Sequence, residues 1–162
     1  MGENFRPKAC MVVGGHKTET PTTLTYSSVV SRDSVRIALL IAALNDLDIL
    51  SCDIQNAYLT APYREKICTV AGPEFGPEKC GKTMIVVRAW YGLKSSGAAF
   101  RAFLAETLRD LGYIPSQADP DVWMRPTIKE DCFKYWEYVL CYIDDLLCLS
   151  NKPKQTLEGI QT

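Results

Sequence analysis

Two adjacent aspartates, Asp144 and Asp145, lie between two apolar runs near the end of this 162-residue sequence. Residues 138–143 precede the acidic pair and residues 146–149 follow it, which predicts an antiparallel hairpin with both carboxylates at its turn. Like charges side by side repel, and each loses solvation near a core, so a bound divalent cation would remove that cost. Two such cations held about 3.5–4 Å apart would suit phosphoryl or nucleotidyl transfer. The alternative is a solvated turn, where aspartate is common.

A third carboxylate, Asp53, ends the short apolar segment 49–53, which we interpret as a buried strand. A carboxylate at a strand end, followed by a tight turn, is well placed to face a metal. The carbonyl of the next residue, Ile54, would lie beside it and could serve as a further oxygen ligand. The alternative is an aspartate that simply begins a turn.

The composition is that of a globular chain, with 47% hydrophobic and 23% charged residues. The longest apolar stretch, residues 37–44, is too short to cross a bilayer, and no secretory signal is visible, so we expect an intracellular protein with no membrane partner. The seven cysteines form no Cys-x-x-Cys pair and His16 is the only histidine, which argues against a zinc site. The net charge of −1 does not advertise nucleic-acid binding, although a local basic face can exist within a neutral total.

Two periodic segments predict the main helices of an α+β fold. The first covers residues 31–47, with Ser31 or Asp33 as its cap and a wide apolar face over positions 35–44. The second follows a cap at Ser95 or Ser96 and ends at Gly112, with apolar residues at positions 100, 103, 104, 108 and 111. We expect strands at 49–53, 83–87 and 122–124 and in the hairpin 138–150. Residues 1–30 are interpreted as short strands and loops, and residues 151–162 as a polar tail.

Three blocks of the sequence, in this order and spacing, resemble the reverse transcriptase domain of copia-type retrotransposons. The match spans about residues 8 to 150, and the blocks are specific together although each is weak alone. They are Asp53 with Ala57-Tyr58-Leu59, then Tyr91-Gly92-Leu93-Lys94 followed by Ala118-Asp119-Pro120-Asp121, and finally Tyr142-Ile143-Asp144-Asp145.

The resemblance implies a right-hand polymerase palm with partial fingers, in which an antiparallel sheet is backed on one face by helices 33–46 and 96–111. Partial fingers would occupy residues 1–30, the palm mainly residues 31–150, and the tail residues 151–162. A thumb and an RNase H domain follow the palm in the family's polyproteins, and we expect neither within these 162 residues. The chain therefore looks like a fragment, a truncated copy or an isolated gene product.

The implied activity is RNA-directed DNA polymerisation, with Asp53, Asp144 and Asp145 as a triad that holds two Mg²⁺ ions, or Mn²⁺. The partners would be an RNA template, a DNA primer, dNTPs and the downstream thumb and RNase H region of a polyprotein. The primer 3′-hydroxyl would attack the α-phosphate of the dNTP. The expected location is the cytoplasm, in a virus-like particle, or the nucleus.

Four further residues take roles that the resemblance implies. Tyr58 matches the aromatic steric gate that excludes a ribose 2′-hydroxyl, the alternative being a core aromatic. Tyr142 would lie near the primer terminus. Lys94 opens the helix expected to cover the incoming nucleotide, the alternative being a solvated lysine. Lys8 matches a basic position of the fingers strand near the triphosphate.

The chain also departs from the family pattern. Cys10 follows Lys8-Ala9 where the family usually has arginine, and residues 95–98 replace the usual Gln-Ala-Pro-Arg. Either this is a divergent branch, or nucleotide binding is weakened. Two alternatives therefore stay open: a folded but catalytically inactive remnant, perhaps a scaffold subunit, and a plain nucleic-acid-binding α+β module.

Overall fold

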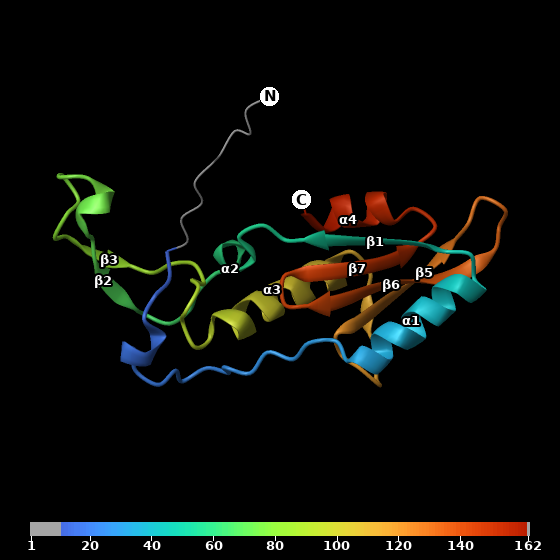
Figure 1. The fold of residues 1–162 in the computed structure, drawn as a ribbon, viewed down its shortest axis with the longest axis horizontal. Helices are drawn as coiled ribbons and strands as arrows, with labels where there is room; N and C mark the ends of the chain where they lie inside the picture. The colour runs from blue at the N-terminus through green and yellow to red at the C-terminus, as the bar shows by residue number, and fades with distance from the viewer. Residues whose placement is uncertain (1–10, 162) are drawn as a thin grey trace, which may run out of the picture.

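The computed structural model describes residues 11–161 of the chain (Figure 1). Two one-turn 3-10 helices, four α-helices and seven strands are present in this part of the chain. In chain order they are η1 (Gly15–Lys17), α1 (Arg32–Leu44), β1 (Asp48–Asp53), α2 (Ala57–Thr60), β2 (Cys68–Val70), η2 (Pro73–Phe75), β3 (Thr83–Ile85), α3 (Ser96–Asp110), β4 (Ile114–Pro115), β5 (Val122–Ile128), β6 (Lys134–Tyr142), β7 (Asp145–Ser150) and α4 (Pro153–Gln161). No helix of these residues is both long and apolar enough to cross a bilayer.

The main sheet has five strands in the order β1-β7-β6-β5-β4, and every neighbouring pair is antiparallel. Strands β2 and β3 form a separate two-stranded sheet, which projects away from the main sheet at the left of Figure 1. Helices alternate with these antiparallel strands along the chain, which confirms the predicted α+β class.

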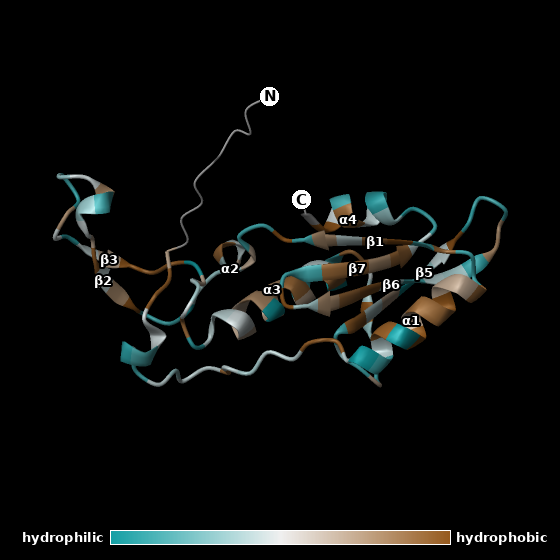
Figure 2. Cartoon of the chain, in the orientation of Figure 1, coloured by the Kyte–Doolittle hydropathy of each residue, from teal (hydrophilic) through white to brown (hydrophobic). Residues whose placement is uncertain are grey.

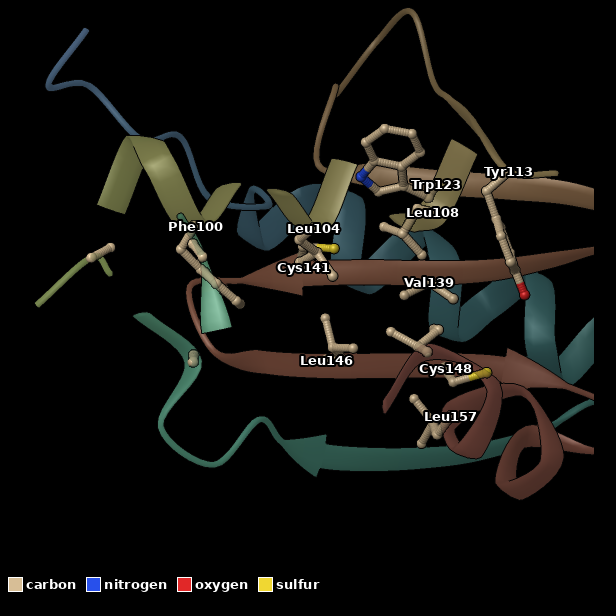
Figure 3. Packing of buried hydrophobic residues seen from close by; sticks show 14 of the residues in the cluster. Phe100, Leu104, Leu108, Tyr113, Trp123, Val139, Cys141, Leu146, Cys148 and Leu157 are labelled. Atoms are coloured by element: carbon tan, nitrogen blue, oxygen red, sulfur yellow. The ribbon is translucent and has the colours of Figure 1, made fainter. Parts of the chain in front are cut away.

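The central hairpin, β6–β7, was predicted correctly at its turn and at β7, whereas β6 begins at Lys134, four residues before the predicted start. Val139 pairs with Cys148 and Tyr142 pairs with Asp145, so only Ile143 and Asp144 form the connection. Val139, Leu146 and Cys148 are almost fully buried, and they lie beneath α3 in the packed space that Figure 3 shows. The apolar runs on each side of the acidic pair are thus the centre of the core.

The two long helices cover opposite faces of the sheet, which corrects the expectation that both would back the same face. Helix α3 packs on the face that carries Val139 and Cys141, whereas α1 packs on the face that carries Leu140. Successive side chains of a strand point to opposite faces, so an apolar run such as 139–141 can serve two cores at once. The continuous apolar character of β6 was the sign that both faces are covered.

Helix α1 begins after Ser31, whose hydroxyl accepts a hydrogen bond from the Ser34 N–H, as predicted. Its buried face is narrower than predicted. Ala38 and Ala42 are buried, while Ile37 and Leu40 keep 59% of their surface exposed. Figure 2 shows that much of α1 is apolar. Small residues therefore let the helix approach the sheet closely, and larger aliphatic side chains face outward.

Helix α3 buries Phe100, Leu104 and Leu108, which confirms its predicted apolar stripe. The predicted cap is wrong in detail, because Ser95 makes no side-chain capping bond. Instead the Ser96 hydroxyl bridges the backbone N–H and carbonyl of Trp90. The helix ends before Gly112, whose φ of +86° is the left-handed conformation expected at that position.

Five other expectations are corrected by the structure. Strand β1 is an exposed edge strand and not a buried one, β3 spans three residues, and β5 extends to Ile128. Residues 11–30 form no strand. The expected polar tail contains α4, which docks Leu157 and Ile160 into the main core. The spacing of these two residues, three apart, is the signal that the sequence reasoning overlooked.

Candidate active site

Asp53 and Asp145 are direct partners in the main sheet. Asp53 is the last residue of β1, Asp145 is the first residue of β7, and the two positions are opposite each other in the antiparallel register. Side chains of directly opposed residues lie on the same face of a sheet, with Cβ atoms about 4.5–5.5 Å apart. Two residues that are 92 positions apart in the sequence are thus brought together by the backbone alone.

Asp144 occupies the β6–β7 turn beside this pair. The Ile54 N–H donates to the Asp144 carbonyl at 2.8 Å, which ties the end of β1 to the turn. The preceding residue, Ile143, has a φ of +56°. Positive φ is unusual for a β-branched residue, and such conformations persist where the surrounding structure enforces them, often at functional sites. The turn is therefore held in a specific shape by its neighbours.

Within the described part of the chain, the three carboxylates have no ion-pair partner. In residues 11–161, none of them forms an ion pair or accepts a side-chain hydrogen bond; the four ion pairs found there all lie elsewhere. No three potential ligand side chains in that part of the chain already converge so as to hold an ion, so full convergence of the triad stays a prediction. Opposed like charges destabilise a sheet, which makes an acidic pair without a partner a costly feature for a purely structural purpose.

Tyr58 lies close to this acidic edge, on α2 just after Asp53. Its ring stacks on Tyr91 with centroids 4.7 Å apart and meets Phe100 of α3 at 6.0 Å. Burial raises the pKa of the Tyr58 hydroxyl, and the negative charge of Asp144 raises it further. Tyr58 is half-buried, with core contacts to Tyr91 and Phe100 and with its hydroxyl within range of the Asp144 charge, so both predicted roles stay open.

A groove of about 480 Å³ runs along the α1 side of the acidic edge. Asp145 and Tyr142 line it together with Arg32, at the first position of α1. The exposed Tyr142 ring therefore borders the same space as one predicted metal ligand. Arg32 did not figure in the sequence reasoning, and only the packing of α1 against the sheet brings its positive charge to this groove.

The remaining predicted site residues have local roles in the structure. The Ile54 carbonyl accepts from the Ala57 N–H at 3.2 Å, within the turn that starts α2. Lys94 donates from Nζ to the Thr18 carbonyl at 3.0 Å. Lys8 lies outside the described residues.

The structure explains why position 92, in the Tyr-Gly-Leu-Lys block, is a glycine. Its φ is +92°, and a Cβ at this position would collide with the carbonyl of Val13. The Val13 N–H in turn donates to the Tyr91 carbonyl at 2.8 Å. Glycine therefore allows the chain near residue 13 to pass directly over the segment that leads to Lys94.

The Ala-Asp-Pro-Asp block connects α3 to the N-terminus of α1. Asp121 is buried and forms an ion pair with Arg101 of α3 at 2.8 Å. Asp119 accepts hydrogen bonds at the N-terminus of α1, from the Ser31 N–H at 2.9 Å and the Ser34 hydroxyl at 2.6 Å. The sequence identified this block but gave no hint of its partners, because Ser31 is 88 residues away from Asp119.

Comparison with known proteins identifies the family of the chain. Residues 3–162 match the family described as reverse transcriptase (RNA-dependent DNA polymerase). The chain is 27% identical over 130 residues to the retrovirus-related Pol polyprotein from transposon RE1 of Arabidopsis thaliana, covering 80% of this chain and 8% of that protein. It is 30% identical over 125 residues to the corresponding polyprotein from transposon TNT 1-94 of Nicotiana tabacum, covering 75% of this chain and 9% of that protein.

The chain thus spans less than a tenth of the polyproteins that it matches. No solved structure matches it with significance. Three sequence blocks, an acidic edge built from two of them and a family match over nearly the whole chain lead to one assignment: the chain belongs to the reverse transcriptase (RNA-dependent DNA polymerase) family and is related to the Pol polyproteins of copia-type retrotransposons.

Proposed function

We propose that this chain is the catalytic palm of an RNA-directed DNA polymerase, which extends a DNA primer with dNTPs on an RNA template. The observation that carries the proposal is the direct pairing of Asp53 with Asp145, with Asp144 beside them and with no ion pair to any of the three in residues 11–161. The family match supports a nucleotidyltransferase of this kind.

The acidic edge fits a divalent cation. Carboxylates on directly opposed positions start from Cβ atoms about 5 Å apart, and each reaches Mg²⁺ with a bond of about 2.1 Å, so a change of rotamer is enough to share an ion. Asp53, Asp144 and Asp145 would hold two Mg²⁺ ions, or Mn²⁺. When bound, these ions would make the primer 3′-hydroxyl a better nucleophile and neutralise charge on the phosphates.

The other site residues would bind and orient the substrates. Tyr142, on the groove beside Asp145, is placed to contact the primer terminus. Tyr58, held by Tyr91 and Phe100, would lie under the sugar of the nucleotide. Lys94 and Lys8 would contact the triphosphate, and Lys94 would first have to leave the Thr18 carbonyl.

The remaining partners follow from the family. In a longer polyprotein the thumb and RNase H region would hold the primer–template, in a cytoplasmic virus-like particle or in the nucleus. Affinity for nucleic acid rests mainly on phosphate contacts and falls steeply with salt. With a net charge of −1, this chain should bind primer–template at low ionic strength and weakly at physiological salt.

The test is primer extension on an RNA template at low salt with Mg²⁺ or Mn²⁺. Asp144→Asn should lower extension by roughly a thousandfold, because loss of a metal ligand removes transition-state charge stabilisation worth several kcal/mol. The matched control is Asp131→Asn, an exposed acidic residue in the β5–β6 loop, which should retain the parent's rate. Equal extension by the parent and Asp144→Asn would contradict the proposal. A folded parent that neither extends a primer nor binds Mn²⁺ would favour the inactive remnant.

A second measurement tests Tyr58. Tyr58→Ala should raise incorporation of ribonucleotides relative to deoxyribonucleotides, because the ring would no longer exclude the 2′-hydroxyl. Phe103, another half-buried aromatic residue packed on the same core, provides the control as Phe103→Ala. An unchanged ratio in Tyr58→Ala would reduce Tyr58 to a core aromatic.

A further inference from the structure

A closed ring of hydrogen bonds joins the start of α1 to the last residues of β6. The Cys141 carbonyl accepts from the Val30 N–H at 3.0 Å, and the Cys141 N–H donates to the Asp121 carbonyl at 2.9 Å. The Asp121 N–H donates to the Asp119 carboxylate at 3.1 Å, and the same carboxylate accepts from the Ser31 N–H at 2.9 Å. Because Val30 and Ser31 are consecutive, the ring is complete.

Asp119 is the only side chain that closes this ring. One carboxylate oxygen receives the Ser31 N–H and the Ser34 hydroxyl, and the other receives the Asp121 N–H. These hydrogen bonds hold the pKa of Asp119 below its ordinary value, although partial burial acts in the opposite direction. A carboxylate at a helix N-terminus is also favoured by the helix dipole.

The ring lies next to the β6–β7 turn that carries Asp144. Cys141 directly precedes Tyr142, which pairs with Asp145 in the sheet. The carbonyl of the turn residue Asp144 accepts a hydrogen bond from the Ile54 N–H. The ion pair between Asp121 and Arg101 adds α3, the helix that carries Phe100 behind Tyr58. Displacement of Cys141 would therefore be transmitted to both the turn and the aromatic cluster.

We infer that Asp119 is a positioning residue of the acidic site: its carboxylate fixes Cys141 and thereby the placement of Asp144 and Asp145. The consequence for catalysis rests on the proposed function, whereas the structural coupling does not. Asp119 itself does not contact the acidic edge, so it acts through Asp121 and Cys141.

The test is amide hydrogen exchange by NMR on this chain, with Asp119→Ala and Asp119→Asn. Asp119→Ala removes three hydrogen bonds, which should accelerate exchange of the Cys141 and Ile54 amides by at least about tenfold. The Leu104 amide, inside α3, reports on global opening and should change less. Asn offers one acceptor oxygen where Asp offers two, so Asp119→Asn should restore part of the protection.

Asp131→Ala is the matched control. Asp131 accepts from the Phe133 N–H at 3.0 Å, the same local contact two residues along the chain, in a loop at the other end of β6. This variant should leave the Cys141 amide at the parent's rate. The inference is overturned if Asp119→Ala leaves Cys141 and Ile54 unchanged, or if it accelerates Leu104 by the same factor.

Mn²⁺ titration of the same samples separates this inference from the proposed function. Broadening of the Asp53 and Asp145 amide signals should require at least about fivefold more Mn²⁺ in Asp119→Ala than in the parent, since a misplaced turn presents its ligands poorly. A parent that shows no such broadening would count against the proposed metal site. The exchange measurements would still decide whether Asp119 positions the turn.

Discussion

The carboxylates at the two ends of the β6–β7 hairpin differ in their hydrogen-bond and ion-pair partners. At the turn, Asp144 and Asp145 stand beside Asp53 with no ion pair among the described residues. Toward the far end of the hairpin, the buried Glu137 is surrounded by donors. It accepts hydrogen bonds from Arg125 at 2.7 Å, Ser150 at 2.5 Å and Thr156 at 2.7 Å, and also from the Tyr113 hydroxyl.

This difference distinguishes a carboxylate that holds the fold from one that is available to a ligand. Burial alone would raise the pKa of Glu137, but the hydrogen bonds and the charge of Arg125 hold it below its ordinary value. Glu137 thereby fastens α4, through Thr156, to the sheet that carries the acidic turn. The three aspartates contribute no such contact, so their removal should affect chemistry and hardly affect stability.

The largest effect should follow from Glu137→Gln. The amide keeps one acceptor but leaves Arg125 without its counter-charge, and because Arg125 is one-third exposed the loss should be about 2 kcal/mol, less than for a fully buried pair. Chemical denaturation should show this loss in the free energy of unfolding, with Glu130→Gln, at an exposed ion pair, as a control that changes it little. Equal stabilities of the two variants would remove the contrast between the two ends of the hairpin.

Acid should act through the same residue. The folded-state pKa of Glu137 lies below its unfolded value of about 4.3, so its stabilisation is fully present above that pH and is lost as the pH falls through the folded pKa. The free energy of unfolding of the parent should therefore decline below about pH 4.3, and the decline should be shallower in Glu137→Gln. Parallel pH curves for the two proteins would contradict the assigned role.

The smallest effect, and one of opposite sign, should come from Asp145→Asn. Neutralising one member of a directly opposed acidic pair relieves repulsion, so the free energy of unfolding should rise by about 0.5 kcal/mol in the absence of divalent cations. Thermal unfolding without Mg²⁺ would measure this change in the free energy of unfolding. In a second set of measurements, added Mg²⁺ should stabilise the parent more than the variant. A loss of stability in Asp145→Asn would mean that this carboxylate supports the fold.

The sequence analysis was correct where the residue pattern of a single segment determines its structure. The acidic turn follows from two aspartates between apolar runs, and α3 follows from Phe100, Leu104 and Leu108 on one stripe. It failed where the answer depends on distant partners. Nothing local says that α1 turns Ala38 toward the sheet and leaves Leu40 outside.

The same reason explains what was missed around the site. Glu137 looks like a solvent-facing residue of an ordinary strand, yet donors from four other segments converge on it. The block that contains Asp119 was visible as a family motif, but its role depends on Ser31, far upstream. Local pattern therefore located the chemistry, and tertiary contacts determine what holds it in place.

The edge position of β1 has a consequence outside the single molecule. An unpaired sheet edge can recruit a strand from another chain, and charged side chains at the edge oppose this. Ile49 and Leu50 are exposed on β1, and Asp48 and Asp53 bracket the strand at its two ends. We therefore expect the charge of Asp53 to oppose pairing between copies of the protein, and a neutral residue at this position to favour edge-to-edge aggregation in concentrated solution.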